Sequence, residues 1–166
     1  MINSILLIVI AIIYMINSSS KKIVYIDNVK LYNEFNMTKE LGTIHEKKYQ
    51  PFLRKFDSLV NTLKNVENKL NKQQKITKKE EEEYMSLKRL VVSADAEVQE
   101  LRSKVKMDIN KMVWERLNAY VQEFGRNYNY DIILGAQGQG NIMYSEEKFE
   151  ATQQFIDYAN SKYEGN

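Results

Sequence analysis

The chain has 166 residues and a formal net charge of +2, and 28% of its residues are charged. The near-neutral charge argues against a nucleic-acid-binding protein. The absence of cysteine excludes disulfide bonds, thiolate metal sites and a thiol nucleophile. One proline and six glycines predict mostly regular secondary structure.

The N-terminal segment is apolar over residues 2–16 and is followed by polar residues and then by Lys21 and Lys22. Such an apolar run is typical of a signal peptide, although no lysine or arginine precedes it here. It is also shorter than the ~17–25 residues that span a bilayer. We expect residues 1–20 to direct export, either as a cleaved signal peptide or as a retained membrane anchor.

A strand and a short helix are expected next. Residues 22–27 are rich in β-branched and aromatic side chains, which predicts a strand. Asp27 or Asn28 can cap a short helix over residues 29–35. We expect Thr38 to cap the long helix that follows.

Two apolar seams occupy the middle of the chain. In each, the apolar residues alternate spacings of three and four, and this mean repeat of 3.5 is typical of supercoiled helices. The seams predict an antiparallel helical hairpin, with helices over about 38–73 and 78–124 and a tip near 71–78. Pro51 lies inside the first helix and is expected to kink it. The predicted seam residues are Tyr49, Phe52, Phe56, Leu59, Leu63, Val66, Leu70, Tyr84, Leu87, Val91, Ala94, Val98, Leu101 and Val105.

The predicted tip carries a basic patch. Residues 64–79 contain six lysines and one glutamate, which gives a local charge of +5. Such a patch would attract anionic lipid or lipopolysaccharide, at about 1 kcal/mol per lysine, or it is simply a solvated loop. Thr77 and Glu80 match a capping box that would start the second helix. The six lysines are Lys64, Lys69, Lys72, Lys75, Lys78 and Lys79.

The chain after the second seam predicts a small body. The apolar stripe widens, as in a helix that packs on more than one partner, and Gly125 is expected to end this helix. Strands are expected at 130–134 and 141–144, joined by a glycine-rich hairpin turn. Thr152 is expected to cap the last helix.

Together these elements predict an α+β, mostly α fold. Residues 22–37 and 109–163 would form one small β-containing body, with the hairpin of residues 38–108 inserted between its two halves. Three strands leave two exposed sheet edges, and such edges favour self-association.

The sequence contains no catalytic constellation. His45, the only histidine, lies four residues before the first seam and has no nucleophile or acid arranged beside it. The glycine-rich stretch 135–140 lacks the Gly-Lys-Ser/Thr ending of a phosphate loop. The glutamates at 80–83 suit a helix N-terminus better than a metal site. We therefore expect no enzyme, no metal and no cofactor.

Residues 22–163 resemble the Skp/OmpH family of periplasmic chaperones. The shared order begins with a strand ending in Ile-Asp and a short helix, and continues through a long charged hairpin to Tyr-Asp-Ile-Ile-Leu at 130–134. It then has Ile-Met-Tyr at 142–144 and Glu-Ala-Thr at 150–152, where the family has an Asp-Ile-Thr helix start.

The resemblance implies a homotrimeric, ATP-independent holdase in the periplasm. In the family, three hairpins extend from a small β-body round a cavity and hold unfolded outer-membrane β-barrel proteins. This chain would be soluble after cleavage or anchored in the inner membrane by residues 2–16. The alternative is a membrane-anchored coiled-coil tether or adaptor with one specific folded partner.

Apolar residues off the predicted seam are the candidate client contacts, because flexible apolar side chains suit a client of many conformations. Alternatively, they widen the seam or lie singly on the surface. The candidates are Ile44, Leu53, Val60, Met85, Leu90 and Val92.

Overall fold

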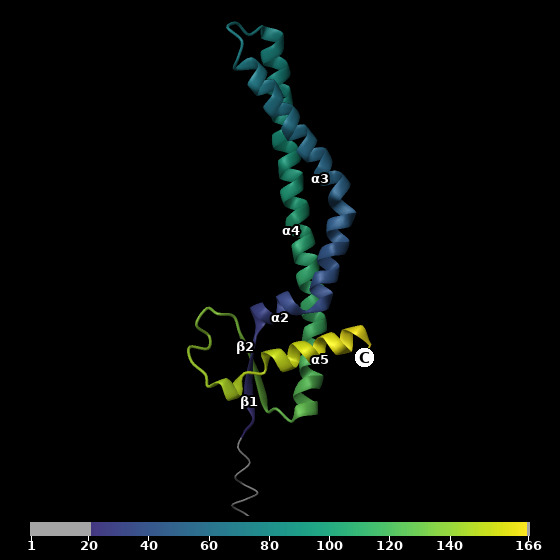
Figure 1. The fold of residues 1–166 in the computed structure, drawn as a ribbon, viewed down its shortest axis with the longest axis vertical. Helices are drawn as coiled ribbons and strands as arrows, with labels where there is room; N and C mark the ends of the chain where they lie inside the picture. The colour runs from purple at the N-terminus through teal and green to yellow at the C-terminus, as the bar shows by residue number, and fades with distance from the viewer. Residues whose placement is uncertain (1–20, 166) are drawn as a thin grey trace, which may run out of the picture. The chain divides into compact units, whose positions relative to one another are not determined.

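The computed structural model describes residues 21–165, so the predicted signal peptide or anchor of residues 1–20 lies outside the described chain. The described residues are mostly helical with one two-stranded sheet, which confirms the predicted α+β, mostly α class. In chain order (Figure 1) the elements are β1 (Ile23–Asp27), α2 (Asn28–Glu34), α3 (Asn36–Leu70), α4 (Lys78–Tyr128), β2 (Ile132–Ala136), the 3-10 turn η1 (Glu147–Phe149) and α5 (Thr152–Glu164).

The chain divides into two compact units. The hairpin unit is Asn36–Arg116, and the body unit combines the residues up to Phe35 with those from Leu117 onward. The long helix α4 therefore contributes its first part to the hairpin unit and its last part to the body unit.

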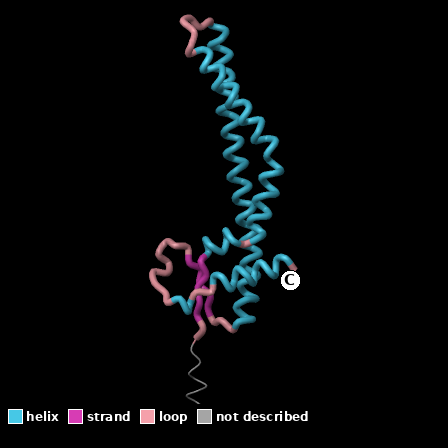
Figure 2. Tube along the Cα trace, viewed as in Figure 1, coloured by secondary structure: helices cyan, strands magenta, loops and turns pink. Residues whose placement is uncertain are grey.

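The hairpin unit consists of α3 and the first part of α4, which run antiparallel (Figure 2). Near the tip, the Tyr84 hydroxyl on α4 donates a hydrogen bond to the Glu67 carboxylate on α3 at 3.2 Å. Val98 and Leu70 are buried, whereas most other seam residues are half-buried. A seam of two positions in seven thus gives this unit only a thin core of its own.

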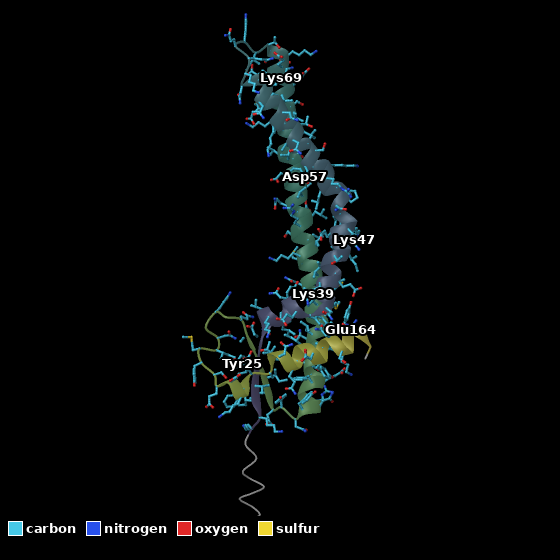
Figure 3. The ribbon with its side chains drawn as sticks, in the orientation of Figure 1. Tyr25, Lys39, Lys47, Asp57, Lys69 and Glu164 are labelled. Atoms are coloured by element: carbon cyan, nitrogen blue, oxygen red, sulfur yellow. The ribbon has the colours of Figure 1, made fainter. Side chains whose placement is uncertain are left out.

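Pro51 lies inside α3, and the helix continues through it to Leu70. Proline has no amide N–H to donate, and its ring crowds the preceding turn, so it bends a helix. Figure 3 shows α3 changing direction between the labelled residues Lys47 and Asp57, on either side of the proline. The curvature agrees with the expected kink.

Two local predictions for the hairpin unit were wrong. Phe35, in an extended conformation, separates α2 from α3, so α3 begins at Asn36 and includes Thr38 in its first turn. The Thr38 hydroxyl is buried and has no hydrogen-bond partner among the described residues. Phe52, a predicted seam residue, is exposed, while its neighbour Leu53 is half-buried. Beside the proline, the half-buried position after Tyr49 is therefore four residues on, at Leu53, and not three.

The sheet of the body unit pairs β1 with β2 in parallel along their whole lengths. The strand expected at 130–134 forms with the bounds Ile132–Ala136. Val24 and Ile26 of β1 are buried, and both α2 and α5 contact this strand. Two parallel strands need a long connection between them, and here the connection is the whole helical hairpin.

The expected strand at residues 141–144, and with it the hairpin turn, was wrong, because this segment is irregular. The Asn141 side chain donates a hydrogen bond to the Gly135 carbonyl and accepts one from the Gln137 amide at 3.0 Å. These bonds hold the chain in a loop and take the place of a hairpin ladder. The other side of the sheet is closed by a β-bridge from β1 to Glu150.

One predicted helix cap was right and one was wrong. Asp27 caps α2, because its carboxylate accepts hydrogen bonds from the amides of Val29 at 2.8 Å and Lys30 at 3.0 Å. Thr152 is the first residue of α5 rather than its cap. Its buried hydroxyl instead accepts a hydrogen bond from the Asp27 amide at 3.0 Å, which ties the start of α5 to the end of β1.

The predicted end of α4 at Gly125 was also wrong. The helix continues to Tyr128 and stops where Asn129 adopts a φ of 55°. The Asn129 amide donates to the Arg126 carbonyl at 3.3 Å, and the Tyr130 amide donates to the Gly125 carbonyl at 2.9 Å. This is a Schellman motif in which asparagine takes the left-handed position that glycine usually occupies.

Aromatic side chains fill the core of the body unit. Phe124 is fully buried, with its ring centroid 5.1 Å from that of Phe155 and 5.3 Å from that of Tyr158. Phe35 is also fully buried and lies edge-on to Tyr163 at 5.5 Å. Leu117, Tyr120 and Phe124 of the widened stripe of α4 are buried in this unit, and Ile109 and Val113 of the same stripe are buried in the hairpin unit.

Candidate functional site

Exposed apolar side chains on the hairpin unit form the first candidate binding surface. Leu53 and Val60 are half-buried. The other four candidates are 45–64% exposed and are Ile44, Met85, Leu90 and Val92. The role of all six in client binding stays a prediction.

Two further exposed apolar residues of this unit were missed by sequence reasoning. Met107 is 61% exposed and Ile76 is 47% exposed. Met107 lies two residues beyond Val105, which places it off the seam by the same spacing argument. Ile76 is the one aliphatic side chain in the loop between α3 and α4. Both signals were therefore present in the sequence.

Two pockets lie between α3 and α4 near the tip. The larger, of about 330 Å³, brings Ile76 and Met85 together with the carboxylates of Glu67 and Glu81. It can accommodate an apolar side chain next to a positively charged one. Leu70, Asn71 and Tyr84 complete its lining. A second pocket of about 270 Å³ is lined by Val66, Lys69, Leu70, Glu80, Glu83 and Leu87.

The capping box predicted at the start of α4 is present. The Thr77 amide donates to the Glu80 carboxylate at 3.0 Å, and the Glu80 amide donates to the Thr77 hydroxyl at 3.3 Å. The hydrogen bond from the Thr77 amide, with help from its hydroxyl, lowers the pKa of Glu80 below its ordinary value. The tip loop is thus fixed to α4 at its C-terminal end.

The six predicted tip lysines are all exposed. Lys78 lies 4.0 Å from Glu82, and Lys79 lies 3.9 Å from Glu83. Exposed ion pairs of this kind stabilise a helix by only a few tenths of a kcal/mol. The glutamate run therefore offsets the charge of these two lysines locally. The other four lysines are Lys64 and Lys69 on α3 and Lys72 and Lys75 in the loop.

An apolar surface on the body unit was not among the predicted sites. Ile132 and Leu134 of β2 are 44% and 46% exposed, although they belong to a sheet. A pocket of about 280 Å³ opens beside Leu134. The sequence signal was a run without charge, residues 132–144, in a chain that is otherwise highly charged. The pocket is lined by Ile23, Val24, Tyr25, Leu134, Ile142, Tyr144, Ser145 and Phe149.

A family model described as outer membrane protein, OmpH-like, matches residues 22–158. The chain belongs to the OmpH-like family. The match includes the sheet, both long helices and the beginning of α5, so it takes in residues of both units. The family resemblance expected from the sequence is confirmed.

A solved structure is similar to this OmpH-like chain. It is a crystal structure of a proposed outer membrane chaperone (OmpH-like) from Caulobacter crescentus CB15, with a TM-score of 0.59 and 12% sequence identity. The similarity covers 87% of this chain and 86% of that one. At this identity the likeness shows a shared fold. A search of curated proteins gave no match.

Other features of the OmpH-like chain concern membranes, metals and the lone histidine. Among residues 21–165 no helix is both long and apolar enough to cross a membrane. The described part of the chain also has no three His, Asp or Glu side chains grouped as metal ligands. The half-buried His45 ring stacks on Tyr49 with centroids 5.9 Å apart, which is a packing contact on one face of α3.

Proposed function

We propose that this OmpH-like protein is an ATP-independent holdase chaperone of the periplasm that binds unfolded outer-membrane proteins. The observation that carries the proposal is the hairpin unit, where single apolar side chains stand exposed in a charged, thinly packed helical frame. Family membership and the fold shared with a proposed outer membrane chaperone support the same function. This activity requires no catalytic residue and no cofactor.

Exposed apolar side chains dispersed along helices suit a client without fixed structure. Full burial of a Leu, Val or Met side chain contributes about 1.5–3 kcal/mol. A client that covers such a residue only in part gains less, so several contacts must act together. Each contact can then break and re-form while the client stays bound, which lets one surface accept many sequences.

The proposed assembly contains three copies, whose hairpin units surround a cavity. Its physical basis is the body unit, because exposed Ile132 and Leu134 on a two-stranded sheet leave apolar surface that one copy does not cover. A two-stranded sheet is also marginal by itself and gains stability from additional strands. A monomeric mass at micromolar concentration would remove the cavity from the proposal.

The holdase activity can be tested by diluting a urea-unfolded outer-membrane β-barrel protein into buffer without nucleotide and following light scattering. The protein should suppress aggregation at about one trimer per client. Replacing the exposed Met85, Leu90 and Val92 by serine should weaken suppression without unfolding the chain. The matched control replaces Glu97 and Gln99, which are exposed on the same helix, by serine.

The same assay separates the holdase from the tether. A holdase should suppress the aggregation of several unrelated β-barrel proteins, whereas a tether would bind one folded partner and suppress none. Absence of suppression by folded, trimeric protein would overturn the proposed function and leave the fold assignment intact.

Anionic lipid or lipopolysaccharide is a further proposed partner of the basic tip. Lys72 and Lys75 project from an exposed loop, and Lys78 and Lys79 follow it. Replacing these four lysines by serine should reduce binding to vesicles with anionic head groups, and the loss should be largest at low salt. Equal binding by the variant and the original protein would show that the tip is only a solvated loop.

A further inference from the structure

The pocket of about 330 Å³ beside the tip loop is acidic, although it lies in a basic part of the chain. Residues 64–79 hold six lysines against one glutamate, Glu67. That glutamate lines the pocket together with Glu81, and the lining contains no lysine or arginine. The smaller tip pocket differs, because Lys69 lies among its carboxylates. The larger pocket is therefore a negatively charged site on a positively charged surface.

The chain itself does not neutralise the two carboxylates of this pocket. Of the four glutamates that begin α4, the first completes the capping box, and Glu82 and Glu83 form ion pairs with lysines of their own helix. Glu81 has no ion-pair partner within residues 21–165. The Glu67 carboxylate accepts a hydrogen bond from the Tyr84 hydroxyl at 3.2 Å and likewise has no cationic partner in the described chain. Both charges remain for a ligand.

Apolar side chains form the rest of the pocket wall. Ile76 is 47% exposed and Met85 is 45% exposed, and both line the pocket beside the buried Leu70. A methionine side chain adapts its shape to different partners. A volume of about 330 Å³ is at the small end of the range for ligand pockets, so it suits one or two side chains of a peptide segment. The wall favours an aliphatic side chain next to a cationic one.

We propose that this pocket binds segments of unfolded clients in which an arginine or lysine adjoins an aliphatic residue. The inference rests on the proposed holdase function and adds a sequence preference to it. The aliphatic side chain covers Ile76 and Met85, and the cation binds the carboxylates of Glu67 and Glu81. A cleft lined by one sign of charge concentrates the opposite sign. The same carboxylates repel anionic head groups, so the pocket and the tip lysines select ligands of opposite charge.

Two labelled peptides test the preference by fluorescence anisotropy at low salt. One is Gly-Leu-Arg-Leu-Gly-Ser, and the other carries citrulline, a neutral analogue of arginine, in place of the arginine. The arginine peptide should bind at least about threefold more tightly, which is within the range of exposed ion pairs. Glu67→Gln combined with Glu81→Gln should remove this preference. Glutamine keeps an acceptor for the Tyr84 hydroxyl, so the variant should fold as the original does.

The matched control combines Glu97→Gln with Glu100→Gln, which changes the net charge equally at exposed positions of α4 outside both tip pockets. This control should keep the arginine preference. A preference that survives in the pocket variant, or that disappears equally in both variants, would overturn the proposal. A change of oligomeric mass in the pocket variant alone would also overturn it, because the pocket would then hold a neighbouring copy.

The aggregation assay on the same proteins separates this inference from the proposed function. If the original protein suppresses aggregation but does not prefer the arginine peptide, the pocket proposal is wrong and the holdase stands. If the original protein does not suppress aggregation, the proposed function and the client assignment of the pocket are both wrong, whichever peptide binds.

Discussion

Thr152 connects two parts of the body unit that are far apart in the sequence, and its hydroxyl offers a sharp test of that connection. The side chain is 1% exposed and accepts the Asp27 amide proton at 3.0 Å, across 125 residues of chain. Thr152→Val keeps the shape of the side chain and removes the acceptor. The Asp27 N–H at the end of β1 would then lose its partner.

The expected cost follows from the asymmetry of hydrogen bonds in proteins. Leaving a buried donor unsatisfied costs about 1–3 kcal/mol, whereas a satisfied bond contributes about 1 kcal/mol net. Thr152→Ser keeps the acceptor and loses one methyl group, which costs about 0.8 kcal/mol of apolar burial. The valine variant should therefore be the less stable of the two, although valine is the better hydrophobic match. For a unit of this size, about 2 kcal/mol lowers Tm by roughly 8–16 °C.

The assay is urea and thermal unfolding followed by tyrosine absorbance, since Tyr130 and Tyr158 report on the body unit. Thr43→Val is the matched control, because its exposed hydroxyl donates only to the Lys39 carbonyl of its own helix. This control should change stability by less than about 0.5 kcal/mol. A Thr152→Val protein as stable as the original would refute the reasoning that this hydrogen bond fastens α5 to β1.

Three further predictions concern the sheet, the hairpin seam and the tip. Gly135→Ala would place a Cβ 2.5 Å from the side-chain nitrogen (Nδ2) of Asn28, so it should destabilise the body by about 1–3 kcal/mol. Asn28→Ala should recover part of that loss in a double-mutant cycle. Leu63→Asp should destabilise the hairpin by about 2–4 kcal/mol and lower its thermal midpoint, because it buries a charge in the seam. The control Asn61→Asp, at an exposed position, should leave the midpoint unchanged. Unchanged melting of Leu63→Asp would contradict the assignment of Leu63 to the seam. The pKa of Glu80 is lowered from 4.5, so its cap is fully present above that pH and is lost as pH falls through the lowered pKa. Amide protection in the first turn of α4, taken as the exchange rate relative to the intrinsic rate at each pH, should fall in acid, and this pH dependence should disappear in Glu80→Gln.

Periodicity and local capping could be read from the sequence where a single physical rule decides the outcome. The seam from Phe56 to Leu70 could be predicted from the sequence because residues three and four apart lie on the same face of a helix. The capping box of Thr77 and Glu80 could be predicted because all of its hydrogen bonds lie within four consecutive residues. Such features need no knowledge of distant parts of the chain.

Several predictions failed because residues distant in the sequence decide what a local group contacts. Thr152 has the sequence of an N-cap, but its hydroxyl binds Asp27 from the other end of the chain. Residues 141–144 have the sequence of a strand, but no strand of the described chain pairs with them. The apolar surface beside Leu134 was missed for the same reason, because exposure depends on what the fold leaves uncovered.

The parallel pairing of β1 with β2 also constrains when this protein can fold. Lys22 and Asp131 meet across 109 residues, and the last β1 residue pairs with Ala136 of a 166-residue chain. A ribosome makes β1 before the hairpin, yet it makes the partner strand β2 only after both long helices. Local helices can form in microseconds, but a contact of such separation forms slowly because the intervening chain must close first. A nascent chain therefore keeps Val24 and Ile26 without their partner strand until the hairpin and β2 have both been made.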